Sequence, residues 1–324
     1  MTIPTTKLGA TGPTVPVLAL GCMGMSDVYG PADETESIAT IHAALERGVS
    51  LLDTGDFYGH GHNELLIAKA LRGRRDNAIL SVKFGGLRSP DGAFVGFDTR
   101  PIAIKNFLGY TLKRLGVDYI DVYRPARLDA TVPIEDTIGA IAEMVKAGYV
   151  RHIGLSEMGV DTIRRAAKVH PIVDLQIEYS LISRGPEAAI LPALAELGIA
   201  TTAYGVLSRG LLTGAKPKAG DFRAHMPRFQ APENQRLVDA LARLAAAKGV
   251  KPAQLAIAWV RSRGPSIIPV LGARTRAQLD DAIAGASLAL TPSELAAIED
   301  AIPASAVVGT RYAAAQMAHL DSER

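Results

Sequence analysis

The sequence predicts an α/β fold in which a parallel sheet is wound with helices. Short apolar runs alternate with longer amphipathic segments along most of the chain, so that strand and helix follow one another in turn. The chain has 324 residues, of which 48% are hydrophobic, and this length is enough to form a large core. Because α/β barrels of this size are often single domains, we expect one domain over residues 1–324.

The first elements are expected to be a hairpin and a strand. Residues 5–20 contain a Gly-Ala-Thr-Gly-Pro turn and end in an apolar run that reaches Gly21. The glycines that follow lack the G-x-G-x-x-G spacing, which argues against a Rossmann phosphate loop at this place. A helix over residues 33–47 comes next, and Gly48 marks its end.

The remaining segments continue the alternation towards the C-terminus. We expect further strands at residues 50–53, 79–83, 119–123, 150–155, 173–177, 199–203 and 267–270. We expect further helices at residues 63–71, 101–115, 134–147, 161–169, 186–197, 234–248, 252–263, 276–284 and 292–301. Asp161 is expected to cap one of these helices, and Thr291 with Glu294 to cap the last. Residues 85–98 and 216–233 are expected to be long loops.

The stretch from Leu51 to Gly59 carries the strongest chemical signal. Asp53 ends a buried strand, where an unpaired carboxylate costs several kcal/mol. Lys83 ends the next strand and is its natural partner, and Tyr58 follows the acid by five positions. Such a pair can hold a tyrosine ready as a general acid, and the lysine is expected to lower the phenol pKa from about 10. A structural ion pair beside a loop tyrosine fits the spacing equally well.

Three segments resemble one known family. Residues 53–59 (DTGDFYG) resemble the aspartate-to-tyrosine signature of the aldo-keto reductases, and Val82-Lys83 resembles their lysine strand. Residues 139–157 (GAIAEMVKAGYVRHIGLSE) resemble a third block of that family. The match runs along most of the chain in the right order. It implies a (β/α)8 TIM barrel with an N-terminal β-hairpin and extra C-terminal helices. It also implies NADP(H)-dependent reduction of an aldehyde or ketone.

Composition narrows the classes of partner. The formal net charge is +2 and the basic residues are scattered, which argues against nucleic acid or a membrane surface as partners. Cys22 is the single cysteine, so no internal disulfide can form, as suits a reducing cytosol. The N-terminal residues show no signal-peptide pattern, and a cytoplasmic location is expected. No metal site is expected, and monomer and homo-oligomer both remain open.

The residues that matter for the proposed chemistry fall at or just after the ends of the predicted strands, at the edge where barrel enzymes place their sites. These residues are Asp53, Tyr58, Lys83, Ala126, Ser156, Gln176, Tyr204 and Arg274. This convergence supports a reaction in which NADPH delivers hydride to a carbonyl carbon. Tyr58 would then donate a hydrogen bond and a proton to the developing alkoxide, while Lys83 and Asp53 tune and orient it.

The cofactor residues follow from the resemblance. Gly21, Cys22 and Met23 would touch the nicotinamide ribose, Ser156 and Gln176 would bind the carboxamide, and Tyr204 would stack on the ring. The pyrophosphate would lie on the backbone of the loop after Tyr204, and the 2′-phosphate at a helix N-terminus, so that NADP(H) is preferred over NAD(H). The residues of these last two groups are Gly205, Leu207, Arg209, Gly210, Gly272, Arg274 and Thr275. Gln278 and Asp281 lie one turn further on and would reach the adenosine. Residues 216–233 would form a lid beside the cofactor.

Position 126 departs from the family pattern. Relatives carry a catalytic histidine there, whereas this chain has Ala126. A lost hydrogen-bond donor of this kind can cost about 3–4 kcal/mol in the transition state. Arg124 has the same strand parity and could supply the donor. A bound water could fill the space instead, or catalysis could be vestigial.

Three functions are therefore compared. The first is a carbonyl reductase with Asp53, Tyr58 and Lys83 as its catalytic set. The second is an NADP(H)-binding regulatory or interaction subunit with weak residual catalysis, which Ala126 favours. The third is an unrelated barrel enzyme that uses Asp53 and Lys83 as base and acid. The sequence does not name the substrate, because specificity would lie in the loops at residues 25–30, 85–98 and 216–233.

Overall fold

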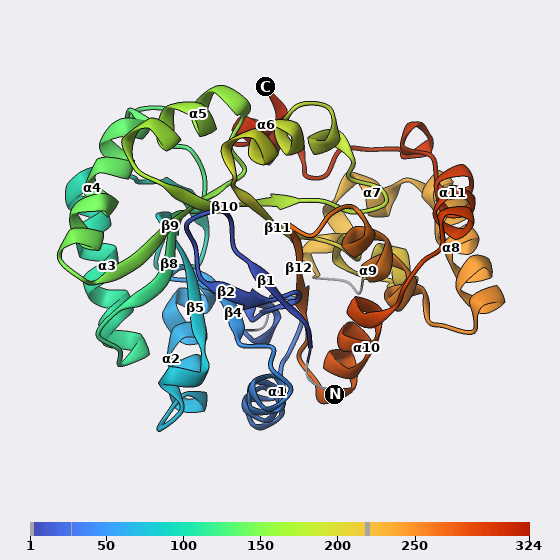
Figure 1. Cartoon of the computed structure of the whole chain (residues 1–324), viewed down its shortest axis with the longest axis horizontal. Helices are drawn as coiled ribbons and strands as arrows, with labels where there is room; N and C mark the ends of the chain where they lie inside the picture. The colour runs from blue at the N-terminus through green and yellow to red at the C-terminus, as the bar shows by residue number, and fades with distance from the viewer. Residues whose placement is uncertain (1–2, 27, 218–220) are drawn as a thin grey trace.

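The computed structural model describes residues 3–26, 28–217 and 221–324. Within these ranges, eight parallel strands close into a barrel that helices surround, as the sequence predicts (Figure 1). The order around the barrel is β3, β4, β5, β8, β9, β10, β11 and β12, and pairing of β12 with β3 closes it. The strands are β3 (Ala19–Gly21), β4 (Leu51–Gly55), β5 (Ile79–Phe84), β8 (Ile120–Pro125), β9 (Val150–Ser156), β10 (Ile172–Glu178), β11 (Ala200–Tyr204) and β12 (Ile267–Gly272).

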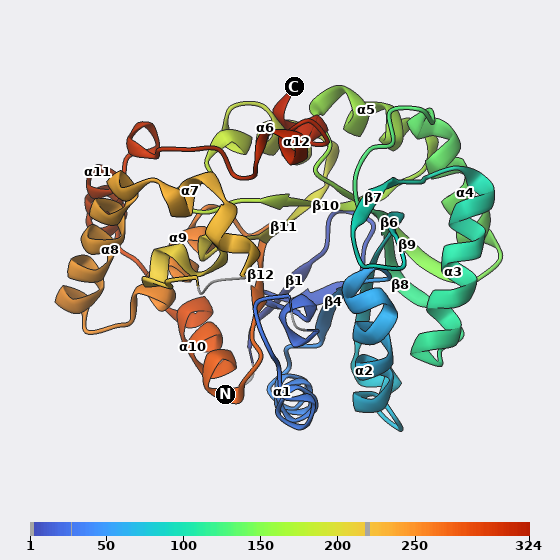
Figure 2. The same ribbon diagram turned by 180° about the vertical axis from the view of Figure 1, so that it is seen from behind.

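The helices lie outside the barrel on all sides, as the views from front and back show (Figures 1 and 2). The longer ones are α1 (Glu34–Glu46), α2 (His62–Ala70), α3 (Pro101–Leu115), α4 (Ile134–Lys146), α5 (Val160–Val169), α6 (Ile190–Leu197), α8 (Gln235–Lys248), α9 (Pro252–Ser262), α10 (Arg276–Ser287) and α11 (Pro292–Ala301). Their apolar faces pack against the outer side chains of the strands and form the larger of two buried clusters. The interior of the barrel forms the second cluster.

The N-terminal hairpin closes the bottom of the barrel. It consists of β1 (Thr5–Lys7) and β2 (Thr14–Pro16), which pair antiparallel as predicted. Leu8 and Val15 are fully buried in the interior cluster. Gly9 has φ +69°, and a Cβ there would lie 2.3 Å from the Val173 carbonyl oxygen at the start of β10. The site must therefore lie at the opposite end, where the strands finish.

Four local predictions differ from the structure. Residues 85–98 are not an open loop, because β6 (Gly86–Arg88) and β7 (Phe94–Phe97) pair into a second hairpin. Residues 216–233 include the short helix α7 (Pro227–Gln230), although residues 218–220 lie outside the described ranges. Helix α6 begins at Ile190, after a separate turn over Gly185–Glu187. Asp161 lies in the first turn of α5, and Gly159 is the N-cap residue instead.

The C-terminal segment, residues 302–324, crosses the molecule after α11. In Figure 1 its red chain runs from α11 towards α6. Asn234 holds its beginning, because it donates to the Val308 carbonyl (2.9 Å) and accepts from the Val308 amide (2.9 Å). Asp321 holds its end by accepting from the Gly159 amide (2.8 Å). The segment includes the short helix α12 (Ala314–Met317).

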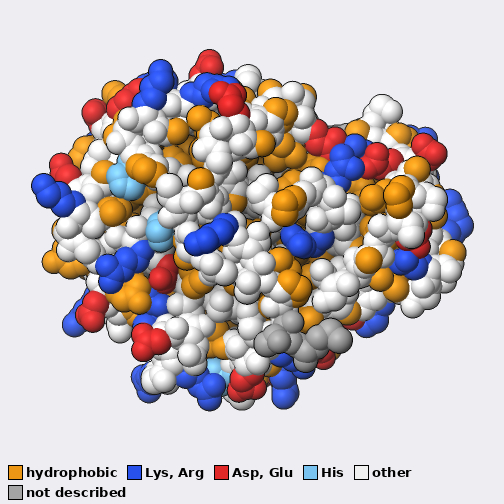
Figure 3. Space-filling model, viewed as in Figure 1, with side chains coloured by type: hydrophobic (Ala, Val, Ile, Leu, Met, Phe, Trp, Pro, Cys, Tyr) orange, Lys and Arg blue, Asp and Glu red, His pale blue; other side chains and the backbone are white. Residues whose placement is uncertain are grey.

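On the face in Figure 3, basic and acidic side chains are interspersed and form no patch of one sign. Among the residues that the structure describes, no helix combines the length and apolarity needed to cross a membrane. Within the same ranges, no three His, Cys, Asp or Glu side chains are grouped so that they could hold a metal ion.

Candidate active site

The loop after β4 presents Tyr58 at the C-terminal end of the barrel. The Asp56 amide donates to the Lys83 carbonyl (2.9 Å), so the loop begins against β5. The ring of Phe57 lies edge-on to that of Tyr58, with centroids 5.0 Å apart. A Cβ at position 86 would lie 2.8 Å from the Phe57 ring, so Gly86 leaves the space that Phe57 needs. Tyr58 is thus positioned by a packed aromatic neighbour.

Asp53 and Lys83 form the buried ion pair that the sequence predicts. Lys83 Nζ lies 2.5 Å from Asp53 Oδ1 and 5.2 Å from the centroid of the Tyr58 ring. Asp53 Oδ2 accepts from Ser81 Oγ (3.1 Å) and from Gln176 Nε2 (2.8 Å). Several donors therefore satisfy this buried carboxylate. The three predicted catalytic residues therefore lie together.

The predicted direction of the Tyr58 pKa is wrong for this structure. Burial raises the pKa of Tyr58 well above its usual value, and the negative charge of Asp53 raises it further, while Arg127 opposes both. Asp53 offsets the charge of Lys83, whose own pKa is lowered by burial. Tyr58 consequently keeps its proton, as a general acid requires. Its hydroxyl has no hydrogen-bond partner within residues 3–26, 28–217 and 221–324.

The residues predicted to hold the nicotinamide lie around this set. Cys22 is buried after β3 and its amide donates to the Asp53 carbonyl (2.9 Å). Burial also raises the pKa of the Cys22 thiol, which makes it unreactive. Ser156 and Gln176 are buried at the ends of β9 and β10. The Gln176 side-chain nitrogen donates a hydrogen bond to Asp53, while its amide oxygen has no partner in the described part of the chain.

Tyr204 has partners that the sequence did not predict. Its hydroxyl donates to Glu157 Oε1 (2.7 Å) and lies 2.9 Å from the Tyr312 hydroxyl. In the following loop, Arg209 pairs with Glu178 (2.8 Å). Gly205 and Gly210 adopt φ of +67° and +96°, so both positions favour glycine. Leu207 stands just before the turn over Ser208–Thr213.

The residues predicted to bind the 2′-phosphate and the adenosine lie around the N-terminus of α10. Arg274 Nη1 donates to the carbonyls of residues 29, 30 and 31 at 3.2–3.4 Å. Thr275 caps α10 by accepting from the Gln278 amide (3.3 Å), and the Gln278 side chain accepts from the Arg274 amide (2.8 Å). Gly272 ends β12 next to them. Asp281 forms an ion pair with Lys251 at the start of α9 (2.8 Å).

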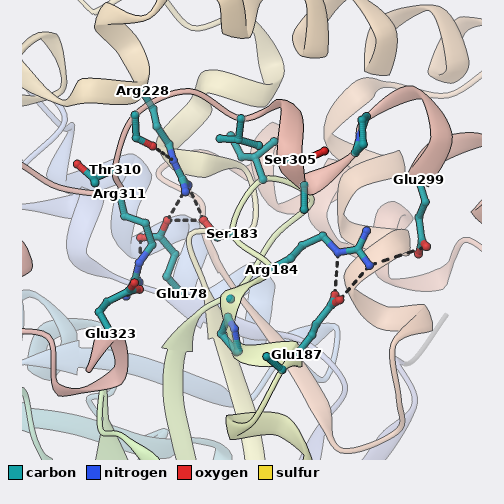
Figure 4. Close-up of a pocket in the computed structure, with 18 of the residues that line it drawn as sticks. Glu178, Ser183, Arg184, Glu187, Arg228, Glu299, Ser305, Thr310, Arg311 and Glu323 are labelled. Atoms are coloured by element: carbon teal, nitrogen blue, oxygen red, sulfur yellow. Dashed lines mark hydrogen bonds and ion pairs between the residues drawn. The ribbon is translucent and has the colours of Figure 1, made fainter.

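The C-terminal segment lies over the ends of β9 and β10. Arg311 is buried and donates to both oxygens of Glu157 at 2.9 and 2.8 Å. Burial alone would raise the pKa of Glu157, but the hydrogen bonds and charge of Arg311 hold it at about 2. Arg311 also lies 3.6 Å from Glu178, at the edge of a groove of about 1010 Å³ (Figure 4). Arg228 faces Glu178 in that groove at 3.6 Å.

Comparison with known proteins decides the family. Residues 17–303 match the profile described as "Aldo/keto reductase family". The chain belongs to the aldo/keto reductase family. It is 36% identical, over 96% of its own length and 95% of the relative's, to the aldo-keto reductase yakc of Schizosaccharomyces pombe, whose name includes NADP(+). It is 38% identical to probable aldo-keto reductase 1 of Glycine max, over 94% and 91% of the two chains.

Solved structures of aldo/keto reductases share the barrel. A glycerol dehydrogenase from Gluconobacter oxydans superposes with a TM-score of 0.83 at 28% identity, over 92% of this chain and 94% of that chain. The holo form of an aldo-keto reductase from Bacillus halodurans superposes with a TM-score of 0.78 at 28% identity, over 93% and 97%. These values exclude the interpretation that the chain is an unrelated barrel.

Arg124 does not offer this aldo/keto reductase an accessible donor in place of a histidine at position 126, because its Nε, although without a partner among the described residues, is buried. Its side chain points into the barrel, as its strand parity predicts, and only 1% of it is exposed. Nη2 donates to Asp174 Oδ1 (3.0 Å) and Nη1 to Thr202 Oγ1 (3.3 Å). Arg124 Nη1 lies 4.0 Å from Asp53. The guanidinium therefore neutralises the charge of Asp174 inside the barrel.

Two tyrosines near Tyr58 in this aldo/keto reductase were not predicted from the sequence. Tyr29 and Tyr312 both act electrostatically on Tyr58, and Arg209 lies over the Tyr312 ring at 4.4 Å from its centroid. The one signal for the tail was an Arg-Tyr pair at positions 311–312 within an alanine-rich stretch. A buried partner for that arginine could have been suspected, but its identity could not.

The Arg311–Glu157 pair is expected to hold the tail over the site. Replacing Arg311 with methionine leaves Glu157 buried without its main partner, and a loss of this kind costs about 3 kcal/mol. The detached fraction of the tail should then rise about 100-fold. Limited proteolysis should cut within residues 302–324 much faster than in the wild type, while the barrel stays intact. Arg324→Met, at an exposed position of the same segment, is the control, and equal cleavage of both variants would contradict this role.

A second polar cluster lies behind the Tyr58 loop and should make stability depend on pH. Asp56 is buried, its Oδ1 has no partner among the described residues, and Glu64 lies near it. Burial first, and then the charge of Glu64, raise the pKa of Asp56 to about 8. The folded state therefore binds this proton more tightly than the unfolded state does. The stabilisation is complete below about pH 4 and is lost as the pH rises through about 8.

Asp56→Asn removes this titrating group, so the stability of the variant is expected to decline less with rising pH than that of the wild type. The free energy of unfolding is measured by urea titration at pH 5, 7 and 9. Its decline with pH should be steeper in the wild type than in the variant by up to about 1.4 kcal/mol per pH unit. Asp76→Asn, at an exposed position, should leave the slope unchanged. Identical slopes for Asp56→Asn and the wild type would show that Asp56 is ionised in the folded protein.

Proposed function

We propose that this aldo/keto reductase uses NADPH to reduce an aldehyde or ketone to an alcohol. The observation that carries the proposal is the buried Lys83–Asp53 pair, 2.5 Å between Nζ and Oδ1, beside the Tyr58 ring. The phenol hydroxyl has no partner within the described residues, and is therefore available to a substrate oxygen. A protonated phenol, a cation beside its ring and a buried counter-ion together suit proton donation.

Each residue of the site has a separate role in the proposed reaction. The cofactor supplies a hydride to the carbonyl carbon. Tyr58 donates a hydrogen bond to the carbonyl oxygen and passes its proton to that oxygen as negative charge develops, so that the product leaves as an alcohol. Lys83 stabilises the phenolate that remains, and Asp53 holds Lys83 in place. Solvent then returns the proton to Tyr58.

The described residues fit NADP(H) at the mouth of the barrel. The free amide oxygen of Gln176 and the buried hydroxyl of Ser156 suit the carboxamide, and Tyr204 offers a ring for the nicotinamide. Gly21, Cys22 and Met23 would approach the ribose. Gly205, Leu207, Arg209 and Gly210 would hold the pyrophosphate, and Gly272, Arg274 and Thr275 the 2′-phosphate. Gln278 and Asp281 would reach the adenosine. Asp281 is the weakest of the proposed contacts, because it pairs with Lys251. The name of the yakc relative, which includes NADP(+), also favours NADP(H) over NAD(H).

The competing proposal is a regulatory or interaction subunit that binds NADP(H) with weak residual catalysis. Ala126 favours it, since the position offers no hydrogen-bond donor. Oxidation of NADPH, followed by absorbance with an activated aromatic aldehyde, separates the two functions. Many turnovers per chain, with the alcohol recovered in equal amount, are expected of a reductase. Quenching of cofactor fluorescence without turnover against a panel of aldehydes and ketones would favour the regulatory subunit.

A further inference from the structure

The site needs a second donor for the substrate oxygen. An oxygen that changes from carbonyl to alkoxide gains negative charge and can accept more than one hydrogen bond. Tyr58 supplies one donor, and Ala126 supplies none because its side chain is a buried methyl group. Arg124 is committed to Asp174 and Thr202. Arg127, the residue that follows Ala126, brings a further cation to this end of β8.

The guanidinium of Arg127 folds back over the barrel end. Its Nη1 donates to the carbonyl oxygen of Ala126 (2.6 Å) and to Ser156 Oγ (3.4 Å). The head group therefore lies between the ends of β8 and β9, and the side chain is half-buried. Ser156 is a proposed carboxamide ligand, so Arg127 borders the place where hydride transfer would occur.

Most of the hydrogen-bonding capacity of Arg127 remains unused. Neither Nε nor Nη2 has a hydrogen-bond partner within residues 3–26, 28–217 and 221–324. Burial alone would lower the pKa of Arg127, but Tyr204, Tyr312 and Glu157 raise it, so the cation stays charged. Its charge also opposes the burial that raises the pKa of Tyr58. A charged donor whose Nε and Nη2 have no partner among the described residues is thus held at the same end of the barrel as the phenol.

We propose that Arg127 is a catalytic residue that donates a hydrogen bond to the substrate carbonyl oxygen beside Tyr58. This proposal rests on the proposed function and deepens it. Arg127 keeps its own proton throughout, because the hydride comes from the cofactor and the transferred proton comes from Tyr58. Its fixed positive charge stabilises the alkoxide as the charge develops, which replaces the donor that Ala126 lacks. Carbonyl compounds whose oxygen can reach both groups are the substrates that this geometry favours.

Arg127→Met tests the role, because methionine keeps much of the apolar stem but removes every donor. We expect kcat to fall about 10²–10³-fold, with little change in NADPH affinity measured by fluorescence quenching. Arg127→Lys should recover part of the loss. Added guanidinium ion at low concentration should partly restore kcat in Arg127→Ala. Arg151→Met, at an exposed position near the start of β9 and therefore at the other end of the barrel, should leave kcat at the wild-type value.

A binding measurement tests the same role without turnover. Benzoate carries a carboxylate whose charge resembles that of the alkoxide, and the NADP-loaded wild type should bind it more tightly than loaded Arg127→Met does. If the wild type fails to turn over carbonyls but shows this difference, the proposed function fails, while Arg127 still binds an anionic oxygen at the site. An unchanged kcat in Arg127→Met, a loss confined to KM, or equal benzoate binding by both proteins would overturn the role.

Discussion

Replacing Tyr58 with phenylalanine is expected to lower kcat by about 10²–10⁴-fold, the usual contribution of a positioned general acid. The substitution removes one hydroxyl and keeps the ring that packs edge-on against Phe57. Because the hydroxyl has no partner among the described residues, the fold should keep its stability. NADPH affinity should also be preserved, since the change lies on the substrate side of the site. Initial rates at saturating NADPH measure the effect.

The pH profile separates a lost proton donor from a general disturbance. Tyr110→Phe removes a hydroxyl from an exposed tyrosine on α3 and should leave kcat unchanged. In the wild type, kcat should stay constant across neutral pH, because burial and Asp53 raise the pKa of Tyr58 far above that range. A Tyr58→Phe variant with kcat near the wild-type value would assign proton donation to another group.

The second large effect is expected at the ion pair inside the barrel. Asp174 and Arg124 are both almost fully buried, with Arg124 Nη2 2.9 Å from Asp174 Oδ2. Thr202 Oγ1 donates to the same oxygen (2.6 Å). Removing one partner leaves the other charge buried and uncompensated, which costs about 3–5 kcal/mol. Asp174→Ala should lower the free energy of unfolding by this amount in urea titrations.

Three further variants test whether the loss of this ion pair causes the loss of stability. Asp174→Leu combined with Arg124→Met replaces both charges with apolar groups and should recover most of the loss. Asp118→Ala, at an exposed position, should leave the midpoint unchanged. Gly154→Ala should also destabilise, because a Cβ there would lie 2.4 Å from Asp174 Oδ1. Equal stability of Asp174→Ala and the wild type would mean that Arg124 finds another partner.

The grouping of Asp53, Lys83 and Tyr58 could be predicted because its signals are local. Asp53 and Lys83 each end an apolar run, and parallel strands that are neighbours bring their ends to the same edge. The register pairs Gly55 with Lys83 across β4 and β5, which places the acid and the lysine within reach of each other. The barrel followed from the same alternation of strand and helix.

The tail and the electrostatics could not be predicted from local patterns. Arg311 finds Glu157 across 154 positions of sequence, and nothing near either residue signals the pairing. The hairpin in residues 85–98 was missed because glycine and proline obscured its strands. The Tyr58 pKa was predicted from one neighbouring charge, whereas its direction depends on burial, which only the folded chain reveals.

The most direct test of the proposed reaction follows the hydride itself. NADPH carrying deuterium on the transferred position of the nicotinamide is mixed with excess wild-type protein and an aromatic aldehyde, for a single turnover. The account predicts one deuterium on the carbinol carbon of each alcohol formed, and a slow or absent reaction in Tyr58→Phe. An alcohol without deuterium, or bound cofactor that is never oxidised by the wild type, would contradict it.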